Sequence, residues 1–600
     1  METASPKAKN TGSGRRFFVG ILAVIGALVI LVAIVSIVGI IALSVEGKIP
    51  GKTILEVDFE KAFIEYVPDD PVAKAFLGSN VIVRNVVDAL EKAAEDDRVV
   101  ALIGRIGTSG IGMAHIQEIR DAIIAFRSSG KQAIAFSETF GEFTAGNVAY
   151  YLATAFDEIY LQPSGDLGLT GLMYESFFLK GTLDKLGLVP RGDRRQEYKS
   201  AFNQFTEEKY TVYHREATQK VMDSQFSQMV KGIAEARALS ELEVRQLIDG
   251  GPFLAQEAVD ARLVDGLAYR DEVYEKVKED TGKGAKLLYL SKYLKRAGRP
   301  HMKGTKVALI YGVGSIMRGK SGFDPLFLEP SMGSETVARA FRDAIKDKNV
   351  KAILFRVDSP GGSYIASDTI WREVLRAKEA GKPVIVSMGN VAGSGGYYIA
   401  MPADKIVAQP ATITGSIGVL SLKMLTNEIW EKVGVSWDEV HTSENATVWS
   451  STHDYTPEQW DRFQDWLDLV YDEFTSKVAR GRNLDKERVL EIAKGRIWTG
   501  EDAKELGLVD ELGGFPTAMR LVREELGIPE DAPIKLTVFP KEKSLFEMLL
   551  GEEESSESSA AENVIRHTLQ IMQPVTRMLR EIGLGPEYGI LAMPETRQIR

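Results

Sequence analysis

A long internal repeat constrains this 600-residue chain more than any other feature of its sequence. The segment Asp96–Ile103 recurs as Asp347–Leu354, and the 19 residues Ala145–Pro163 recur as Ala392–Pro410 with nine identical positions. The two copies also end alike, in Leu-Val-Asp-Gly-Leu and Leu-Val-Asp-Glu-Leu. Similarity of this length does not arise by chance, so we interpret the chain as a tandem duplication of one domain.

Each copy alternates short apolar stretches with segments of helical periodicity. In the second copy the pattern predicts strands at Val307–Tyr311, Ala352–Val357, Val384–Ser387 and Lys405–Ala408, with helices at Ser367–Glu379 and Ser394–Ala400. Strands that alternate with helices are typical of a parallel sheet with crossover connections. We therefore expect two α/β domains, at residues 46–297 and 298–543, divided near the basic stretch Lys295–Lys303.

Residues 17–45 form a 29-residue run without a charged side chain. A bilayer-spanning helix needs about 20 apolar residues, whereas the apolar part of a cleaved signal peptide has only about 7–15. Four basic residues precede the run, and positive flanks stay on the cytoplasmic side; they are Lys7, Lys9, Arg15 and Arg16. We expect a basic cytoplasmic tail at 1–16, a single transmembrane anchor in the lipid bilayer of the cytoplasmic (inner) membrane, and a large body on its extracytoplasmic side.

The composition excludes several classes of function. The chain has no cysteine, which removes disulfides, thiolate nucleophiles and cysteine-ligated metal centres. Its formal net charge of −11 argues against a nucleic-acid partner. Its six histidines show no metal-ligand spacing, so we expect neither a metal nor another cofactor. Beyond the duplication we predict an acidic, serine-rich linker at 544–563 and a helical tail at 564–600.

Two glycine-rich turns that follow predicted strands distinguish the second copy. The backbone N–H groups of a turn such as Gly361-Gly362 can bind a substrate carbonyl, and Ser394, between two glycines at the start of a helix, has an accessible hydroxyl. Together they supply a nucleophile and oxyanion donors for acyl transfer, and we expect the donors to be the N–H groups of Gly362 and Gly395. Close packing alone would also explain such turns. The first copy has Asn147 in place of Ser394 and lacks the nucleophile.

Four motifs carry a resemblance to a known family. DSPGGS, NVAGSGGYYIA, ATITGSIGV and GRIWTGEDAKELGLVDELGG, which begin at residues 358, 390, 411 and 495, resemble the signal peptide peptidase A (protease IV) family in its long tandem form. The resemblance implies two ClpP/crotonase-like domains and a Ser–Lys dyad. Ser394 matches the nucleophile, Lys199 in its Tyr-Lys-Ser context matches the general base, and Ser416 matches a residue that supports the lysine. The counterpart of the Lys199 region, His441–Thr456, has no lysine, so each copy keeps half of the dyad.

A lysine acts as a base near neutral pH only if its pKa falls about 2–3 units below the usual value of about 10.4. We expect burial to lower the pKa of Lys199, with an apolar wall beside the amine and no carboxylate close to it. The wall would comprise Tyr198, Phe202 and Phe205, while Glu197, Glu207 and Glu208 would face solvent.

These features predict a membrane-anchored serine endopeptidase that cleaves hydrophobic peptides, such as released signal peptides, outside the cytoplasm. The resemblance further implies a homotetramer. Two other functions stay open: a crotonase-like acyl-CoA enzyme, which would use the Gly-Gly turn without a serine nucleophile, and a membrane scaffold or chaperone whose site has degenerated. His441 stays a rival to Lys199 as the base, because it lies in the second copy's counterpart of the Lys199 region.

Overall fold

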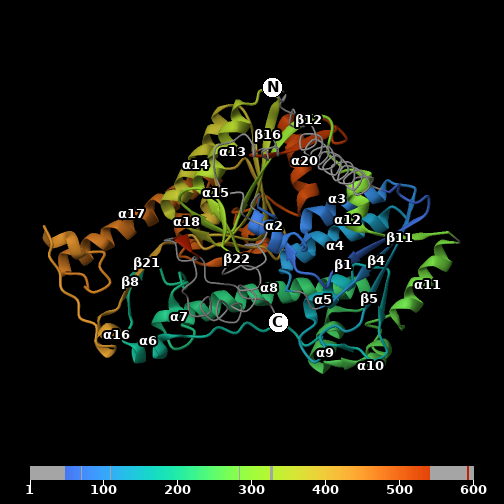
Figure 1. The fold of residues 1–600 in the computed structure, drawn as a ribbon, viewed down its shortest axis with the longest axis horizontal. Coiled ribbons are helices and arrows are strands. Elements are labelled where there is room, and N and C mark those ends of the chain that lie inside the picture. Colours follow the sequence, from blue (N-terminus) through green and yellow to red (C-terminus); the bar gives the residue numbers. More distant parts are fainter. Residues whose placement is uncertain are drawn as a thin grey trace, which may run out of the picture.

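The computed structural model describes residues 47–68, 71–107, 110–282, 284–324, 329–540 and 591–592. The predicted tail and anchor at 1–45, the acidic linker and most of the C-terminal tail lie outside these residues. Within the described ranges, no helix combines the length and the apolar character that crossing a membrane requires. The chain forms two α/β halves packed against each other, blue to green for the first repeat and yellow to red for the second (Figure 1).

The first repeat is built on a parallel six-stranded sheet with the order β10-β6-β5-β4-β1-β11. Its strands are β1 (Thr53–Asp58), β4 (Val99–Arg105), β5 (Gln132–Ser137), β6 (Glu158–Leu161), β10 (Gly266–Leu267) and β11 (Lys286–Tyr289). The described helices are α2 (Pro71–Leu77), α3 (Val83–Ala94), α4 (Met113–Ser128), α5 (Asn147–Ala153), α6 (Lys180–Leu186), α7 (Asn203–Thr206), α8 (Val212–Arg237), α9 (Glu241–Gly250), α10 (Ala255–Asp260), α11 (Arg270–Thr281) and α12 (Leu290–Ala297).

The second repeat is built on a sheet with the order β22-β20-β18-β16-β12-β24, in which β19 also pairs with β18 and β23. Only the β20–β22 pair of this sheet is antiparallel among the described strands. The strands are β12 (Thr305–Val313), β16 (Val350–Ser359), β18 (Val384–Gly393), β19 (Lys405–Ala408), β20 (Ile413–Gly415), β22 (Ile497–Thr499), β23 (Glu511–Leu512) and β24 (Ile534–Phe539). The helices are α13 (Ser334–Lys346), α14 (Tyr364–Glu379), α15 (Gly395–Ala400), α17 (Pro457–Arg482), α18 (Lys486–Ile492), α19 (Gly500–Glu505) and α20 (Phe515–Leu526). The mixed α/β architecture with parallel sheets, predicted from the sequence, is confirmed.

The second sheet is covered on both faces, which explains why its strands read as continuous apolar runs. Along β12, Val307 and Leu309 pack in one cluster with residues of α20. Ala308 and Ile310 point to the opposite cluster, which contains residues of α13 and α14. Val87 from α3 joins the first of these clusters, so the first repeat helps to cover the second sheet.

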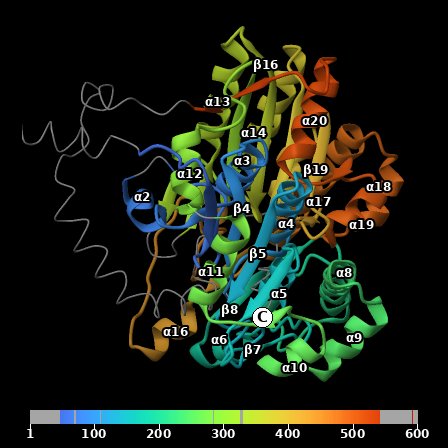
Figure 2. The same ribbon diagram turned by 90° about the vertical axis from the view of Figure 1, so that its right-hand side faces the viewer.

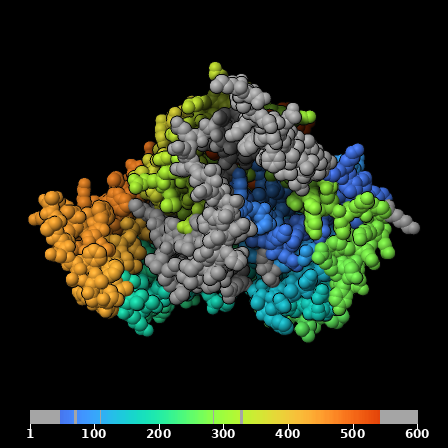
Figure 3. All heavy atoms as spheres, in the orientation of Figure 1, coloured from blue at the N-terminus to red at the C-terminus, as the bar shows by residue number. Residues whose placement is uncertain are grey.

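Further contacts join the two repeats near the ends of their strands. Strand β8 (Val189–Arg194) of the first repeat pairs antiparallel with β21 (Leu420–Leu425) of the second, and α8 packs against β22. The β8–β21 ribbon, together with α6 (Lys180–Leu186) and α16 (Asn427–Lys432), lies in an arm at one end of the molecule, at the left of Figures 1 and 3. Helix α8 also contacts α19 of the second repeat, where Lys220 Nζ lies 3.1 Å from Asp502 Oδ1, and the two helices lie close together in Figure 2.

A small separate sheet lies beside the predicted Gly-Gly turn. Its order is β14-β15-β13-β17-β25, and its strands are β14 (Gly322–Asp324), β15 (Glu329–Gly333), β13 (Ser315–Met317), β17 (Gly361–Gly362) and β25 (Leu591–Ala592). Strand β25, from the C-terminal tail, pairs antiparallel with β17, with Ala592 opposite Gly361 and Leu591 opposite Gly362. A segment from the end of the chain therefore pairs in extended form with the two glycines.

Candidate active site

Ser394 occupies a strained turn between β18 and α15. Its backbone has φ +54° and ψ −114°, a region that residues other than glycine rarely adopt and that costs about 1–3 kcal/mol. The Ser394 N–H donates to the carbonyl of Gly415 (2.8 Å), and the N–H of Tyr398 donates to the Ser394 carbonyl (2.9 Å). Because a residue with positive φ cannot continue a helix, the helix predicted from residue 394 begins at Gly395. Sharp strand-to-helix turns of this kind present nucleophilic side chains.

The side chain of Lys199 reaches this serine from the first repeat. Its Nζ lies 2.8 Å from Ser394 Oγ, 3.0 Å from the carbonyl oxygen of Ser416 and 3.0 Å from Ser416 Oγ. All three residues are fully buried, with 0% exposure. The structure thus brings the predicted lysine and both predicted serines together within one chain, although Lys199 and Ser394 are 195 positions apart in the sequence.

Burial lowers the pKa of Lys199 well below 10.5. Of the three glutamates predicted to face solvent, Glu208 is exposed, whereas Glu197 and Glu207 are half-buried. Glu197 faces Lys494, with 3.7 Å between Oε1 and Nζ. Desolvation by the surrounding protein is therefore the physical cause of the shift, because it disfavours the charged ammonium.

The three aromatic residues predicted to form an apolar wall beside the Lys199 amine pack in two different clusters. Phe202 and Phe205 are buried in a small cluster with residues of α6 and β21. Tyr198 packs partly against another cluster, and its hydroxyl donates to Glu216 Oε2 (2.9 Å). Tyr198 is therefore tied to α8 through a polar contact as well as an apolar one.

Two glycines that the sequence reasoning did not single out enclose Lys199. A Cβ at Gly418 would lie 3.3 Å from Lys199 Cδ, and a Cβ at Gly495 would lie 2.5–2.7 Å from its Cβ, N and Cα. Gly495 also has φ +76°, and its N–H donates to the carbonyl of Ile417 (2.8 Å). Backbone approach that only glycine permits therefore fixes the position of the Lys199 main chain. Both glycines lie inside the motifs that carry the family resemblance, and those motifs could have pointed to them.

The two glycines predicted as oxyanion donors lie next to each other. Gly361 and Gly362 have φ +104° and +149°, and a Cβ at Gly395 would lie 3.1 Å from the backbone nitrogen of Gly362. The nitrogen of Gly362 is thus close to the residue that follows Ser394. On its other side Gly362 pairs with Ile316 of β13. The structure thus places Gly362 and Gly395 next to each other at the serine turn.

Comparison with known proteins identifies the family. The model of peptidase family S49 matches residues 125–283 and 376–528, one stretch in each repeat. The chloroplastic serine protease SPPA of Arabidopsis thaliana is 31% identical over 472 residues, which cover 77% of this chain and 68% of that protein. Protease 4 of Salmonella typhi is 33% identical over 452 residues, which cover 73% of this chain and 71% of that protein. The chain belongs to peptidase family S49.

Membership of this family makes the chain a serine peptidase, so the acyl-CoA enzyme and the degenerate scaffold are set aside. Among solved structures, a point mutant of ClpP1 from Listeria monocytogenes matches with a TM-score of 0.23 and 15% identity. That match covers 36% of this chain and 94% of the ClpP1 chain.

In this S49 peptidase, the first repeat uses the counterpart of the serine position for structure. The Asn147 side-chain oxygen accepts hydrogen bonds from the N–H groups of Thr170 (2.8 Å) and Gly171 (2.9 Å). Its amide nitrogen donates to the Gly171 carbonyl (2.8 Å). Both polar atoms of the Asn147 amide are thus occupied in holding a loop, which accounts for asparagine at this position.

The rival base His441 lies in the arm of the S49 peptidase. Its ring is exposed, Nδ1 lies 3.0 Å from the carbonyl of Ser443, and Nε2 lies 3.8 Å from Glu439. The side chain that contacts Ser394 is Lys199. The structure therefore does not bring His441 together with the predicted nucleophile.

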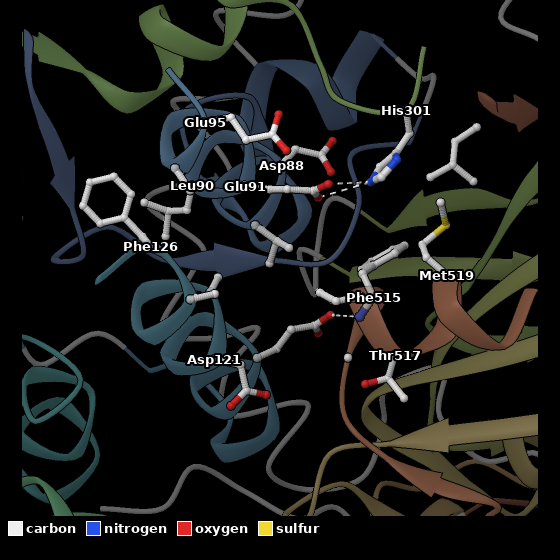
Figure 4. A pocket seen from close by; sticks show the side chains of 18 of the residues that line it. Asp88, Leu90, Glu91, Glu95, Asp121, Phe126, His301, Phe515, Thr517 and Met519 are labelled. Carbon is white, nitrogen blue, oxygen red and sulfur yellow. Dashed lines mark hydrogen bonds and ion pairs between the residues drawn. The ribbon is translucent and has the colours of Figure 1, made fainter. Parts of the chain in front are cut away.

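A cavity of 570 Å³ lies between α3 and α4 of the first repeat and α20 of the second (Figure 4). His301 and Glu91 contact each other at its rim, with 3.1 Å between Nε2 and Oε2. On the opposite wall the N–H of Phe515 donates to Glu118 Oε1 (2.8 Å). Ser394, Lys199 and Ser416 do not line this cavity, so we assign no part of the peptidase reaction to it.

Proposed function

We propose that this S49 peptidase is a membrane-anchored Ser–Lys endopeptidase that cleaves hydrophobic peptides, such as released signal peptides, outside the cytoplasm. One observation carries the proposal: a fully buried lysine amine lies 2.8 Å from the hydroxyl of a serine in a strained turn. Burial lowers the pKa of the amine and so favours its neutral form, which can accept a proton. Nucleophile and base within hydrogen-bond reach are the parts that acyl transfer needs.

The contacts of Lys199 match the hydrogen-bonding capacity of a neutral amine. Such an amine has two N–H groups and one lone pair. The N–H groups donate to the carbonyl and the hydroxyl of Ser416, both at 3.0 Å, and the lone pair accepts the hydroxyl proton of Ser394. Ser416 therefore orients the base, which is the role that the motif resemblance implies for it.

The reaction follows from these positions. Ser394 Oγ forms a bond to the peptide carbonyl carbon while its proton moves to Lys199 Nζ, and the N–H groups of Gly362 and Gly395 donate to the oxyanion. The C–N bond then breaks, and Lys199 gives the proton to the leaving amine. A water molecule transfers a proton to Lys199 and attacks the ester, and Lys199 returns the proton to Ser394 Oγ as the acid product leaves.

The pairing of β25 with β17 supports binding of the substrate as an extended strand. Gly361 and Gly362 accept an antiparallel partner through their main chain, and the partner in this structure is the apolar pair Leu591–Ala592. Main-chain pairing gives affinity without demanding a particular sequence. A peptide in extended form would therefore fit the same edge.

The apolar run at 17–45 supports a single-pass anchor in the cytoplasmic membrane, and the motif resemblance supports a homotetramer. Membrane fractionation of the full chain against a chain lacking residues 1–45 tests the anchor. Light scattering of the same two proteins after size-exclusion chromatography tests the tetramer. A monomer in both preparations would overturn the oligomer, and recovery of the full chain in the soluble fraction would overturn the anchor.

The peptidase proposal is tested by hydrolysis of an apolar fluorogenic peptide between pH 6 and pH 10. We expect Ser394→Ala and Lys199→Met to lower kcat by at least about 1,000-fold, since removal of either member of a nucleophile–base pair leaves only binding and oxyanion stabilisation. Lys494→Met is the matched control, because Lys494 lies beside Lys199 in space but is half-exposed and pairs with Glu197. It should retain the wild-type kcat.

Labelling by a fluorophosphonate separates the two roles. The wild-type protein should be labelled at Ser394, Ser394→Ala should not be labelled, and Lys199→Met should be labelled slowly. If Lys199→Met hydrolyses the peptide at the wild-type rate, the base is another group, and His441→Gln is the next variant to measure. Wild-type hydrolysis by both variants would overturn the assignment of the site.

A further inference from the structure

The first repeat also reaches the catalytic region through the N-terminus of α4. His115, in the first turn of this helix, is 4% exposed and lies against residues 389–391 of β18 in the second repeat. A Cβ at the preceding Gly112 would lie 2.2–2.3 Å from the side-chain atoms of Asn390. The start of α4 is therefore packed directly on the segment that leads to Ser394.

Two hydrogen bonds define how His115 and Asn390 interact. The backbone N–H of His115 donates to Asn390 Oδ1 (3.0 Å), which fixes the orientation of the amide. The Asn390 Nδ2 then donates to Nδ1 of the imidazole (2.7 Å). Since Nδ1 accepts a hydrogen bond, the ring proton of neutral His115 is on Nε2.

The Nε2 side of the ring faces two carboxylates. Nε2 lies 2.9 Å from Glu65 Oε2 and 3.5 Å from Asp358 Oδ2. Asp358 in turn connects both parts of the site, because its Oδ1 accepts a hydrogen bond from the N–H of Val391 (2.9 Å). Asp358 is three residues before Gly361, and Val391 is three residues before Ser394. The Asp358 carboxylate thus links the segment that leads to Gly361 and Gly362 with the part of β18 that leads to Ser394.

Buried charges fix α4 in this position. The Arg356 side chain, 0% exposed, donates to Glu65 Oε1 (2.8 Å) and to Glu118 Oε2 (2.6 Å), and also to the hydroxyl of Ser387 (2.8 Å). Glu118 lies one turn after His115 on the same helix. Strand β16 is therefore bonded through Arg356 to Glu118 of α4 and to Glu65. Strand β18 is joined to the same guanidinium through Ser387.

The ligand atoms of Glu65, His115 and Asp358 lie within 4.8 Å of one another, a spacing that a metal ion could use. Two contacts argue for another role. Nε2 carries the ring proton, and both oxygens of Glu65 bind the guanidinium of Arg356, at 2.8 and 3.0 Å. A bound cation would face that guanidinium and would have to displace the proton.

We infer that His115 is a positioning residue of the peptidase: its ring is hydrogen-bonded to Asn390 on one side and packs against the carboxylates of Glu65 and Asp358 on the other, and thereby keeps the Ser394 turn and the Gly361-Gly362 strand in register. The expected effect of His115 on kcat rests on the proposed function. Its expected effect on the packing of the Ser394 turn does not. His115 touches neither Ser394 nor Lys199 and takes no part in proton transfer.

The test compares His115→Ala, His115→Gln and Asn390→Ala with the wild type. We expect His115→Ala to lower kcat about 10- to 100-fold with KM within about twofold, since displacements near 1 Å in a catalytic group have effects of this size. The glutamine amide reaches the position of Nε2 but not that of Nδ1, so His115→Gln should recover part of kcat. Asn390→Ala removes the same contact from the other side and should repeat the loss. The pH at which activity rises should stay unchanged in all three, because Lys199 is intact.

His301→Ala is the matched control, because His301 is another histidine at the junction of the repeats that contacts a glutamate, at the cavity of Figure 4. It should retain wild-type kcat. Hydrogen exchange of peptides covering residues 388–396 should be faster in His115→Ala and Asn390→Ala and unchanged in His301→Ala. Exchange does not depend on activity, so it decides the structural part of the inference even if the wild type hydrolyses no peptide.

Wild-type kcat and exchange in His115→Ala would overturn the inference. So would a loss that His115→Gln does not relieve, or a change confined to KM. A shift of the pH profile would assign His115 to proton transfer and would also overturn it. Thermal unfolding of each variant shows whether it folds; if His115→Ala does not, Asn390→Ala and His115→Gln carry the comparison.

Discussion

The substitution Gly495→Ala tests how closely the Lys199 backbone must be held. The added Cβ would lie 2.5 Å from Lys199 Cβ, whereas ordinary contacts begin near 3.4 Å. The Lys199 backbone must therefore retreat by about 0.9 Å, and displacements near 1 Å can lower the rate of a catalysed step about 100-fold. Alanine at φ +76° also costs about 1–2 kcal/mol of stability. We expect kcat to fall about 100-fold and the free energy of unfolding to fall by at least the strain.

The control for this substitution is Gly527→Ala. Gly527 has φ +61°, and a Cβ there would meet nothing within 4 Å, so it introduces the same backbone strain without the collision. Both variants should lose stability in urea unfolding, but only Gly495→Ala should lose peptide hydrolysis and fluorophosphonate labelling. A wild-type kcat in Gly495→Ala would show that Lys199 tolerates a shift of this size. An equal loss of activity in both variants would assign the effect to strain alone.

Burial and strand pairing give three further predictions. Between the lowered pKa of Lys199 in the folded chain and 10.5, the unfolded chain holds one more proton than the folded chain. The free energy of unfolding of the wild type, measured in urea relative to Lys199→Met, should therefore rise by about 1.4 kcal/mol per pH unit in this range. A difference that stays constant with pH would contradict a neutral Lys199. Arg356→Met removes the guanidinium from two buried carboxylates and should cost about 3–5 kcal/mol, whereas the exposed Arg372→Met should barely move the thermal midpoint. Deletion of residues 587–600 removes β25 from Gly362 and should lower KM for an extended peptide about two- to tenfold at unchanged kcat, and an unchanged KM would refute competition by the tail.

The sequence was sufficient to predict the α/β class, because parallel strands buried on both faces leave a direct trace as apolar runs. Val384–Ser387 and Lys405–Ala408 were found in this way, although β18 continues to Gly393. The extension could not be predicted, since its last residues include polar and glycine positions whose pairing with β20 depends on tertiary contacts. The start of α15 was missed by one residue because positive φ at Ser394 is fixed by hydrogen bonds to Gly415 and Tyr398.

The site was predictable only as far as local motifs extend. Ser394 and Gly362 lie in glycine-rich turns whose chemistry can be recognised, and Lys199 was selected through its Tyr-Lys-Ser context and the resemblance. His115 has no such signal, because its importance depends on contacts with Asn390 and Asp358 that are more than 240 residues away in sequence. The sequence likewise carries no local signal that the carboxylate of Asp358 joins two strands.

The distribution of the site over two repeats makes catalysis depend on their interface. Three separate connections surround Lys199 and Ser394: the β8–β21 ribbon, the packing of α8 on β22, and the charged contacts of Arg356 with Glu65 and Glu118. The first two are held by the hydrogen bonds of a strand pair and by packing that includes a hydrogen bond between Ser224 and Thr499 (3.0 Å). The charged contacts add a large further cost to any shift of one repeat, because a shift separates a fully buried guanidinium from its carboxylates. The Arg356 network therefore fixes the relative position of the repeats, and with it the distance between Nζ and Oγ.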